Sequence, residues 1–304
     1  MTRRTRATLY ALATVLLWST VASAFKLSLR RLDPLQLLLY ASAVSTLVLA
    51  VILAAQGRLG VLLTYTRGQY LRSAVLGLLN PLLYYLVLFG AYDRLPAQEA
   101  QALNYTWAIT LALLSVPLLG QRLRRGDVAG GLLGYAGVVV IATRGDPLGL
   151  HFSDPLGVSL ALGSTVLWSL YWIANTRDDR DPVAALFLNF LFGLPFVWLG
   201  CALFSEVRLP DAGGLLGAAY VGTFEMGIAF VLWLRALRLA ENASRVGNLV
   251  FLSPFLSLVF IRTFVGEAIL PSTFAGLALI VGGLAVQQLF TSPPSAPRSS
   301  PPCA

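Results

Sequence analysis

Long apolar runs separated by short polar segments dominate this chain. About 20 apolar residues are enough for a helix to cross the hydrocarbon layer of a membrane. We expect ten such spans, over residues 7–25, 34–55, 69–91, 97–119, 127–143, 156–174, 183–204, 212–234, 246–265 and 273–290. The segments between them carry Gly, Pro, Asp and Arg, which are typical of loops. The pattern therefore predicts an all-α membrane protein with ten transmembrane helices.

The composition supports this prediction. Of the 304 residues, 57% are hydrophobic and 12% are charged, whereas soluble domains average about 25% charged residues. The formal net charge is +8, but the basic residues are scattered between apolar runs, so we expect the lipid bilayer and no nucleic acid as a partner. Cys201 and Cys303 have neither metal-ligand nor disulfide spacing. No cofactor and no metal are expected.

The distribution of arginine predicts the orientation. Most arginines fall on the cytoplasmic side if both termini are placed in the cytoplasm, as the positive-inside rule requires. Lys26, Arg30 and Arg31 form a local exception just outside the first span. The Pro/Ser-rich tail, residues 291–304, is predicted to be a disordered cytoplasmic segment.

The N-terminal segment allows a second interpretation. Basic residues followed by an apolar run and the sequence Ala22-Ser23-Ala24 are also typical of a secretory signal peptide. Cleavage there would leave nine spans and remove Trp18. We therefore interpret residues 7–25 as a retained first helix.

An internal repeat organises the spans. Residues 103–137 align with 249–283 at a shift of 146, pairing Gly130 with Gly276 and Gly137 with Gly283, and a shift of 150 places Trp18 on Trp168. The chain is therefore predicted to consist of two five-helix halves, residues 1–145 and 146–290. An odd number of spans per half inverts the second half, as in many secondary transporters that bind substrate near the midplane. Alternatively, duplication produced only a helical bundle.

Several motifs resemble a known family. They are "LSPFLSLVF…VGE" at 252–267 with the glycines at 276–283, "LLWST" at 16–20, and "AQEAQALNYTWAITLALL" at 97–114. The chain resembles the EamA-type ten-helix exporters of the drug/metabolite transporter superfamily, and residues 97–114 are similar to its aromatic-amino-acid exporters. The resemblance implies two inverted repeats, export across the bacterial inner membrane, and a central cavity lined mainly by helices 1, 3, 4, 6, 8 and 9. The first repeat departs from the pattern, with Ala108 opposite Pro254 and Gln121 opposite Glu267.

Glu225 is the candidate coupling residue. It lies near the middle of the span 212–234, where an ionisable group is costly and by default suggests a function. It could exchange protons or bind a cationic group of the substrate. The alternative is a protonated structural side chain that is hydrogen-bonded between helices.

Amides and aromatic rings supply the candidate substrate-binding residues. An amide both donates and accepts hydrogen bonds, which suits a zwitterion, and aromatic walls suit planar substrates. The alternative roles are hydrogen bonding between helices and anchoring at the membrane interface, for which Trp198 and Trp233 are better placed. The predicted substrate-binding residues are Trp18, Asn80, Tyr84, Gln101, Asn104, Trp107, Trp168, Tyr171 and Asn248.

Pro254 is the candidate hinge, because proline removes a backbone donor and frees a carbonyl within a span. No P-loop and no Ser/His/Asp or Cys/His arrangement is present. The sequence therefore predicts a secondary transporter that exports amino acids or similar small metabolites, and no enzyme. Proton coupling is a candidate mechanism, and a monomer is the favoured state. Export of other metabolites or drugs such as nucleosides, or a membrane-embedded enzyme, are the alternatives.

Overall fold

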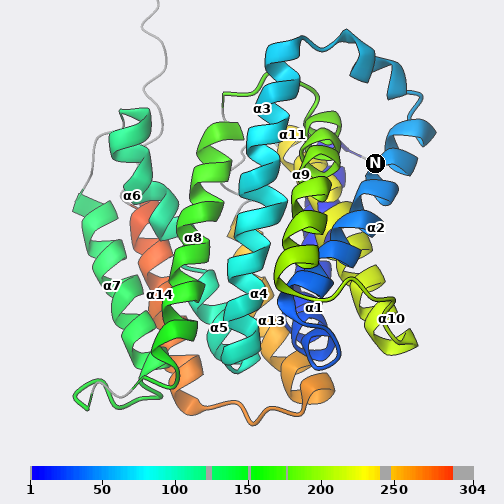
Figure 1. Cartoon of the computed structure of the whole chain (residues 1–304). Coiled ribbons are helices and arrows are strands. Elements are labelled where there is room, and N and C mark those ends of the chain that lie inside the picture. Colours follow the sequence, from blue (N-terminus) through cyan, green and yellow to red (C-terminus); the bar gives the residue numbers. More distant parts are fainter. Residues whose placement is uncertain (1, 121–124, 150–151, 176, 240–247, 290–304) are drawn as a thin grey trace, which may run out of the picture.

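A computed structural model describes residues 2–120, 125–149, 152–175, 177–239 and 248–289 (Figure 1). Within these ranges ten helical segments lie side by side, and eight of them are long and apolar enough to cross a membrane. They are α1 (Arg3–Leu29), α2 (Pro34–Ala55), α3 (Arg67–Gly77) with η2 (Leu78–Leu83) and α4 (Tyr84–Arg94), α5 (Ala97–Asn104) with α6 (Trp107–Leu119), α7 (Arg125–Ala142), α8 (Pro155–Asn175), α9 (Pro182–Phe204), α10 (Ala212–Tyr220) with η3 (Val221–Ala229) and α11 (Phe230–Leu239), η4 (Asn248–Leu252) with α13 (Ser253–Phe260) and η5 (Ile261–Val265), and α14 (Pro271–Leu289). A further short 3-10 helix, η1 (Leu59–Thr64), connects α2 to α3. The predicted multi-pass, all-α fold with ten helices is confirmed. The tail 291–304 lies outside the described residues.

Aspartates in the loops determine where several helices begin. Asp33 accepts hydrogen bonds from the backbone N–H groups of Leu35 and Gln36, at 2.8 and 3.0 Å. Asp181 and Asp211 cap α9 and α10 in the same way. An aspartate satisfies N–H groups that have no partner inside the helix, and it also interacts favourably with the helix dipole.

Successive segments run in opposite directions, so the bundle has two ends. The end at which α1 begins carries Arg58, Arg72 and Arg180 and is called the Arg180 end. The opposite end carries the corner between α4 and α5 and is called the Lys26 end. The helix α8 begins at the Lys26 end, opposite to the start of α1 (Figure 1). The division of the chain at residue 145 stays a prediction.

The three basic residues that break the positive-inside pattern have local partners. Lys26 donates from Nζ to the carbonyl oxygens of Tyr92 and Leu95, at 2.7 and 2.8 Å. Arg30 donates to the carbonyl oxygen of Val265 at 2.9 Å, and Arg31 pairs with Asp211 at 2.5 Å. Positive charge is favourable at helix C-termini. The carbonyl oxygens at the end of α4 therefore account for a lysine at position 26 on this side of the bundle.

Glycines allow α7 and α14 to pack backbone against backbone. A Cβ on Gly130 would collide with the carbonyl oxygen of Gly283, and one on Gly137 would collide with that of Gly276. Gly130 and Gly276 occupy equivalent positions in the repeat, as do Gly137 and Gly283. Gly130 therefore contacts the equivalent of Gly137, and Gly137 contacts the equivalent of Gly130, which is the exchange produced by a two-fold axis between two helices.

Four of the ten segments are interrupted within the bundle. Asn80 has non-helical angles within η2, where Pro81 follows it, and η3 is π-helical. The helix α6 begins at Trp107 and α13 begins at Ser253, and these positions are equivalent at the 146-residue shift. The break between α5 and α6 occurs without a proline.

Candidate functional site

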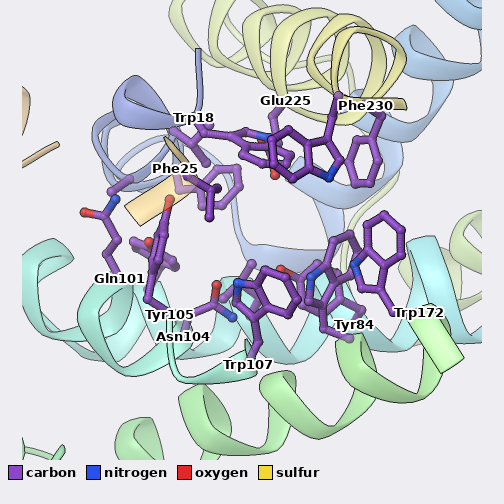
Figure 2. A pocket seen from close by; sticks show the side chains of 17 residues that line it. Trp18, Phe25, Tyr84, Gln101, Asn104, Tyr105, Trp107, Trp172, Glu225 and Phe230 are labelled. Carbon is purple, nitrogen blue, oxygen red and sulfur yellow. The ribbon is translucent and has the colours of Figure 1, made fainter. Parts of the chain in front are cut away.

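A cavity of about 70 Å³ lies where the interrupted helices meet (Figure 2). Figure 2 shows two walls facing each other, with Trp18, Glu225 and Phe230 on one side and Tyr84 and Trp107 on the other. The full lining comprises Trp18, Val21, Ala22, Phe25, Tyr84, Leu88, Tyr92, Gln101, Asn104, Tyr105, Trp107, Trp168, Trp172, Glu225, Phe230, Trp233 and Val250. We call this space the central cavity.

Aromatic rings in mutual contact form much of its wall. The Trp168 ring stacks on Tyr84 with centroids 4.5 Å apart, and it meets Phe230 edge-on at 5.5 Å. Trp18 contacts Trp233 at 5.4 Å. Such rings provide large, rigid apolar surfaces together with polar N–H or O–H groups. The wall is therefore suited to a planar or aromatic group.

Glu225 supplies the only acidic group among the residues that line this cavity. The π-helical η3 places the side chain there, and the residue is 8% exposed. The Tyr85 hydroxyl donates to Oε1 at 3.4 Å, whereas Oε2 has no hydrogen-bond partner in the described structure. A buried carboxylate oxygen without a partner is costly. Oε2 is therefore available to accept a hydrogen bond from a bound group or to take up a proton.

Amides lie across the cavity from Glu225. Asn104, the last residue of α5, donates from Nδ2 to the Ser164 hydroxyl at 3.0 Å. Gln101 lies one turn earlier, and its Oε1 is buried without a described partner. The first turn of α6 follows immediately, so the positive end of its dipole lies beside Asn104 and Trp107.

The structure brings together most, but not all, of the residues predicted to form the site. Trp18, Tyr84, Gln101, Asn104, Trp107, Trp168 and Glu225 line the central cavity. Asn80 and Tyr171 lie elsewhere: Asn80 is fully buried, and neither of its side-chain polar atoms has a hydrogen-bond partner among the described residues, whereas Tyr171 accepts a hydrogen bond from Asn189 at 3.2 Å. Pro254 is in the first turn of α13, where its missing N–H removes no helix hydrogen bond. The side chain of Asn248 lies outside the described residues.

The prediction that Trp233 anchors at the membrane interface is wrong. Trp233, expected to anchor at the interface, is 7% exposed and lines the cavity, whereas Trp198 is 53% exposed as expected. Phe25 and Phe230 were also missed. Phe25 could have been found from the sequence, because Trp18, Ala22 and Phe25 follow helical spacing along one face.

A second cavity lies on the Arg180 side of the first. Its volume is about 190 Å³, and its lining includes Tyr171, Asn175, Asp178 and Arg180. Trp172 and Phe230 line both cavities. These two aromatic side chains therefore form the partition between them.

Charged groups that line the second cavity are already paired. Arg180 bonds Asp178 at 2.7 Å and Ser73 Oγ at 2.7 Å. Burial alone would raise the pKa of Asp178, but the hydrogen bonds and charge of Arg180, with the charge of Arg72, hold this pKa below its ordinary value. No group of three or more His, Cys, Asp or Glu residues suited to a metal ion occurs in the described ranges.

Comparisons with known proteins agree with this architecture. The chain is 31% identical over 287 residues to the "Aromatic amino acid exporter YddG" of Ancylobacter novellus, covering 94% of this chain and 98% of that protein. It is 24% identical over 279 residues to the "Probable terminal-alkyne amino-acid exporter" of Streptantibioticus cattleyicolor, covering 89% of each. A crystal structure superposes with a TM-score of 0.67 at 30% identity, covering 93% of this chain and 96% of the other. The model of the EamA-like transporter family matches twice, at residues 5–143 and 155–287. The chain therefore belongs to the EamA-like transporter family and is a multi-pass membrane transporter.

Proposed function

We propose that this protein is a secondary transporter that exports aromatic amino acids across the bacterial inner membrane by alternating access. The observation that carries the proposal is the central cavity, in which an aromatic wall, one carboxylate and the two amides of Gln101 and Asn104 surround a single space at interrupted helices. The name of the Ancylobacter relative supports the same substrate class.

Each part of such a substrate has a complementary group. The ring would lie against the stacked Tyr84 and Trp168 side chains, and the ammonium group would pair with the unpartnered Oε2 of Glu225. The carboxylate would lie at the first turn of α6. Half-helix N-termini bind anionic groups in this way in transporters with discontinuous helices.

The small size of the cavity supports alternating access. About 70 Å³ is room for a few water molecules, whereas sites for small molecules generally measure several hundred Å³. A substrate must therefore enter while the helices are further apart. Displacement of Trp172 and Phe230 would join the central cavity to the second cavity at the Arg180 end.

Charge supports the proposed orientation. Arg58, Arg72, Arg177, Arg180 and Arg238 all lie at the Arg180 end, and an excess of arginine marks the cytoplasmic side. Both termini then lie in the cytoplasm, and the Lys26 end faces outward. The central cavity is complete within one chain, which supports a functional monomer.

A competition assay tests the substrate class. Purified protein in proteoliposomes would exchange labelled L-tryptophan against unlabelled aromatic, aliphatic and charged amino acids and nucleosides. We expect aromatic amino acids to compete most strongly. Competition by nucleosides alone would favour the export of other metabolites, and chemical conversion of a substrate would favour an enzyme.

A further inference from the structure

A third hollow lies on the face of α1 that points away from the central cavity. It has a volume of about 770 Å³ and lies between α1, α10 and the α13–η5 segment. Figure 1 shows these helices grouped at the Lys26 end. Thr20, Ser23, Ala24 and Leu27 form its floor on α1, whereas Trp18, Ala22 and Phe25 line the central cavity. We call this hollow the lateral groove.

The lateral groove opens onto the lipid-facing surface. Leu216 and Phe264 line it and are 71% and 60% exposed, and Phe260 stacks on Phe264 with centroids 6.0 Å apart. Exposed apolar side chains in a membrane protein contact lipid chains. The groove is therefore filled from the bilayer and not from water.

Arg30 and Arg31 give the lateral groove a charged end. Both side chains line it. Arg31 already pairs with Asp211, and Arg30 has a backbone carbonyl as a partner but no acidic partner in the described part of the chain. A positive charge therefore remains where the groove reaches the membrane surface, and this charge would attract a phosphate group.

The length of the lateral groove along α1 matches the thickness of the hydrocarbon region of one leaflet. Thr20 and Arg31 are about 16 Å apart along the helix at 1.5 Å per residue, and half of the hydrocarbon layer is about 15 Å thick. An amphiphile with its headgroup at the arginines would thus place its chain along the whole groove.

A polar group also lies in the floor of the lateral groove. The Ser23 hydroxyl is buried, at 4% exposure for the residue, and has no hydrogen-bond partner among the described residues. A purely apolar occupant would leave this donor unpaired, at the cost of its desolvation.

We propose that the lateral groove is a binding site for an anionic phospholipid, with its phosphate on Arg30 and Arg31 and one acyl chain along α1. In the proposed orientation the lipid belongs to the outer leaflet. The site is separate from the central cavity, so it does not depend on the identity of the transported substrate.

Native mass spectrometry of the purified full-length chain tests this site. The protein would be titrated with phosphatidylglycerol, with phosphatidylcholine carrying the same acyl chains, or with inorganic phosphate. We expect one high-affinity phosphatidylglycerol adduct. The double variant R30Q/R31Q should weaken its binding about tenfold, because each basic residue near a membrane surface contributes to anionic-lipid attraction.

Two further variants distinguish lipid binding in the lateral groove from non-specific attraction of anionic lipid to surface arginines. Ala24→Leu fills the groove without a change of charge and should also weaken phosphatidylglycerol binding. Arg94→Gln removes an exposed arginine at the same end, outside the groove, and should leave binding unchanged. Equal binding of phosphatidylcholine, displacement by inorganic phosphate, or unaltered binding in both R30Q/R31Q and Ala24→Leu would overturn the proposal.

Discussion

Glu225 brings an ionisable group into an otherwise aromatic and amide-lined space. Its carboxylate accepts a hydrogen bond from Tyr85 and lies close enough to Trp18 to interact with it, and its Oε2 has no hydrogen-bond partner within 3.5 Å among the described residues. A purely structural carboxylic acid would be expected to have both oxygens bonded. The unpaired oxygen therefore favours a role in binding an ammonium group or in proton exchange.

Replacing Glu225 by Gln separates these roles from a structural one. Gln keeps the size and hydrogen-bonding capacity but can neither carry a negative charge nor release a proton. We expect tryptophan exchange to fall at least tenfold, and any stimulation by a pH gradient to disappear. Exchange and pH profiles would be measured in proteoliposomes. Glu206→Gln, the same change on an exposed loop carboxylate, is the matched control, and wild-type behaviour of Glu225→Gln would assign the residue to structure alone.

At the scale of elements, the corner between α4 and α5 is held from both sides. Lys26 on α1 bonds the carbonyl oxygens at the end of α4, and Glu267 accepts from Ala97 N at 2.9 Å and Gln98 N at 3.3 Å at the start of α5. Opposite charges thus lie at opposite helix ends, each with the sign that the helix dipole favours. These polar contacts of Lys26 and Glu267 hold the α4–α5 corner in place at the Lys26 end.

Removal of the Glu267 contacts with this corner should destabilise the protein. Glu267→Ala leaves two N–H groups without their acceptor, which costs about 1–3 kcal/mol for a buried group. The midpoint of thermal unfolding in detergent should fall by several degrees. Glu206→Ala should leave the midpoint unchanged, and an equal change in both variants would show that the contact contributes nothing specific.

The close glycine contacts between α7 and α14 predict that a large side chain at this contact lowers the stability of the protein. Gly137→Leu would force a side chain against the carbonyl oxygen of Gly276, and overpacking of this kind costs about 1–3 kcal/mol or more. We expect a lower unfolding midpoint than for Gly60→Leu, since a Cβ at Gly60 meets no atom within 4 Å. Comparable midpoints would mean that α7 and α14 separate easily.

At the scale of the whole molecule, hydropathy alone predicted the spans, because a segment that crosses a membrane must carry apolar side chains over most of its length, even where its helix is interrupted. Trp18 and Trp168, which the 150-residue shift aligns, were both predicted to bind substrate, and both line the central cavity. Sequence could not place Asn80, because the irregular backbone at η2 turns its side chain away from the helical stripe. Trp233 was missed for a related reason: its neighbour Trp18 comes from a helix more than 200 residues earlier in the chain.

Tryptophan flux through a Trp168 variant tests whether the central cavity is the transport site. Proteoliposomes containing the wild-type chain, Trp168→Leu or the matched control Trp198→Leu would be compared for labelled L-tryptophan exchange. Loss of the ring stacked on Tyr84 should reduce exchange at least tenfold, whereas the lipid-exposed Trp198 should be dispensable. Equal flux through Trp168→Leu and the wild type would contradict the assignment of the central cavity as the transport site.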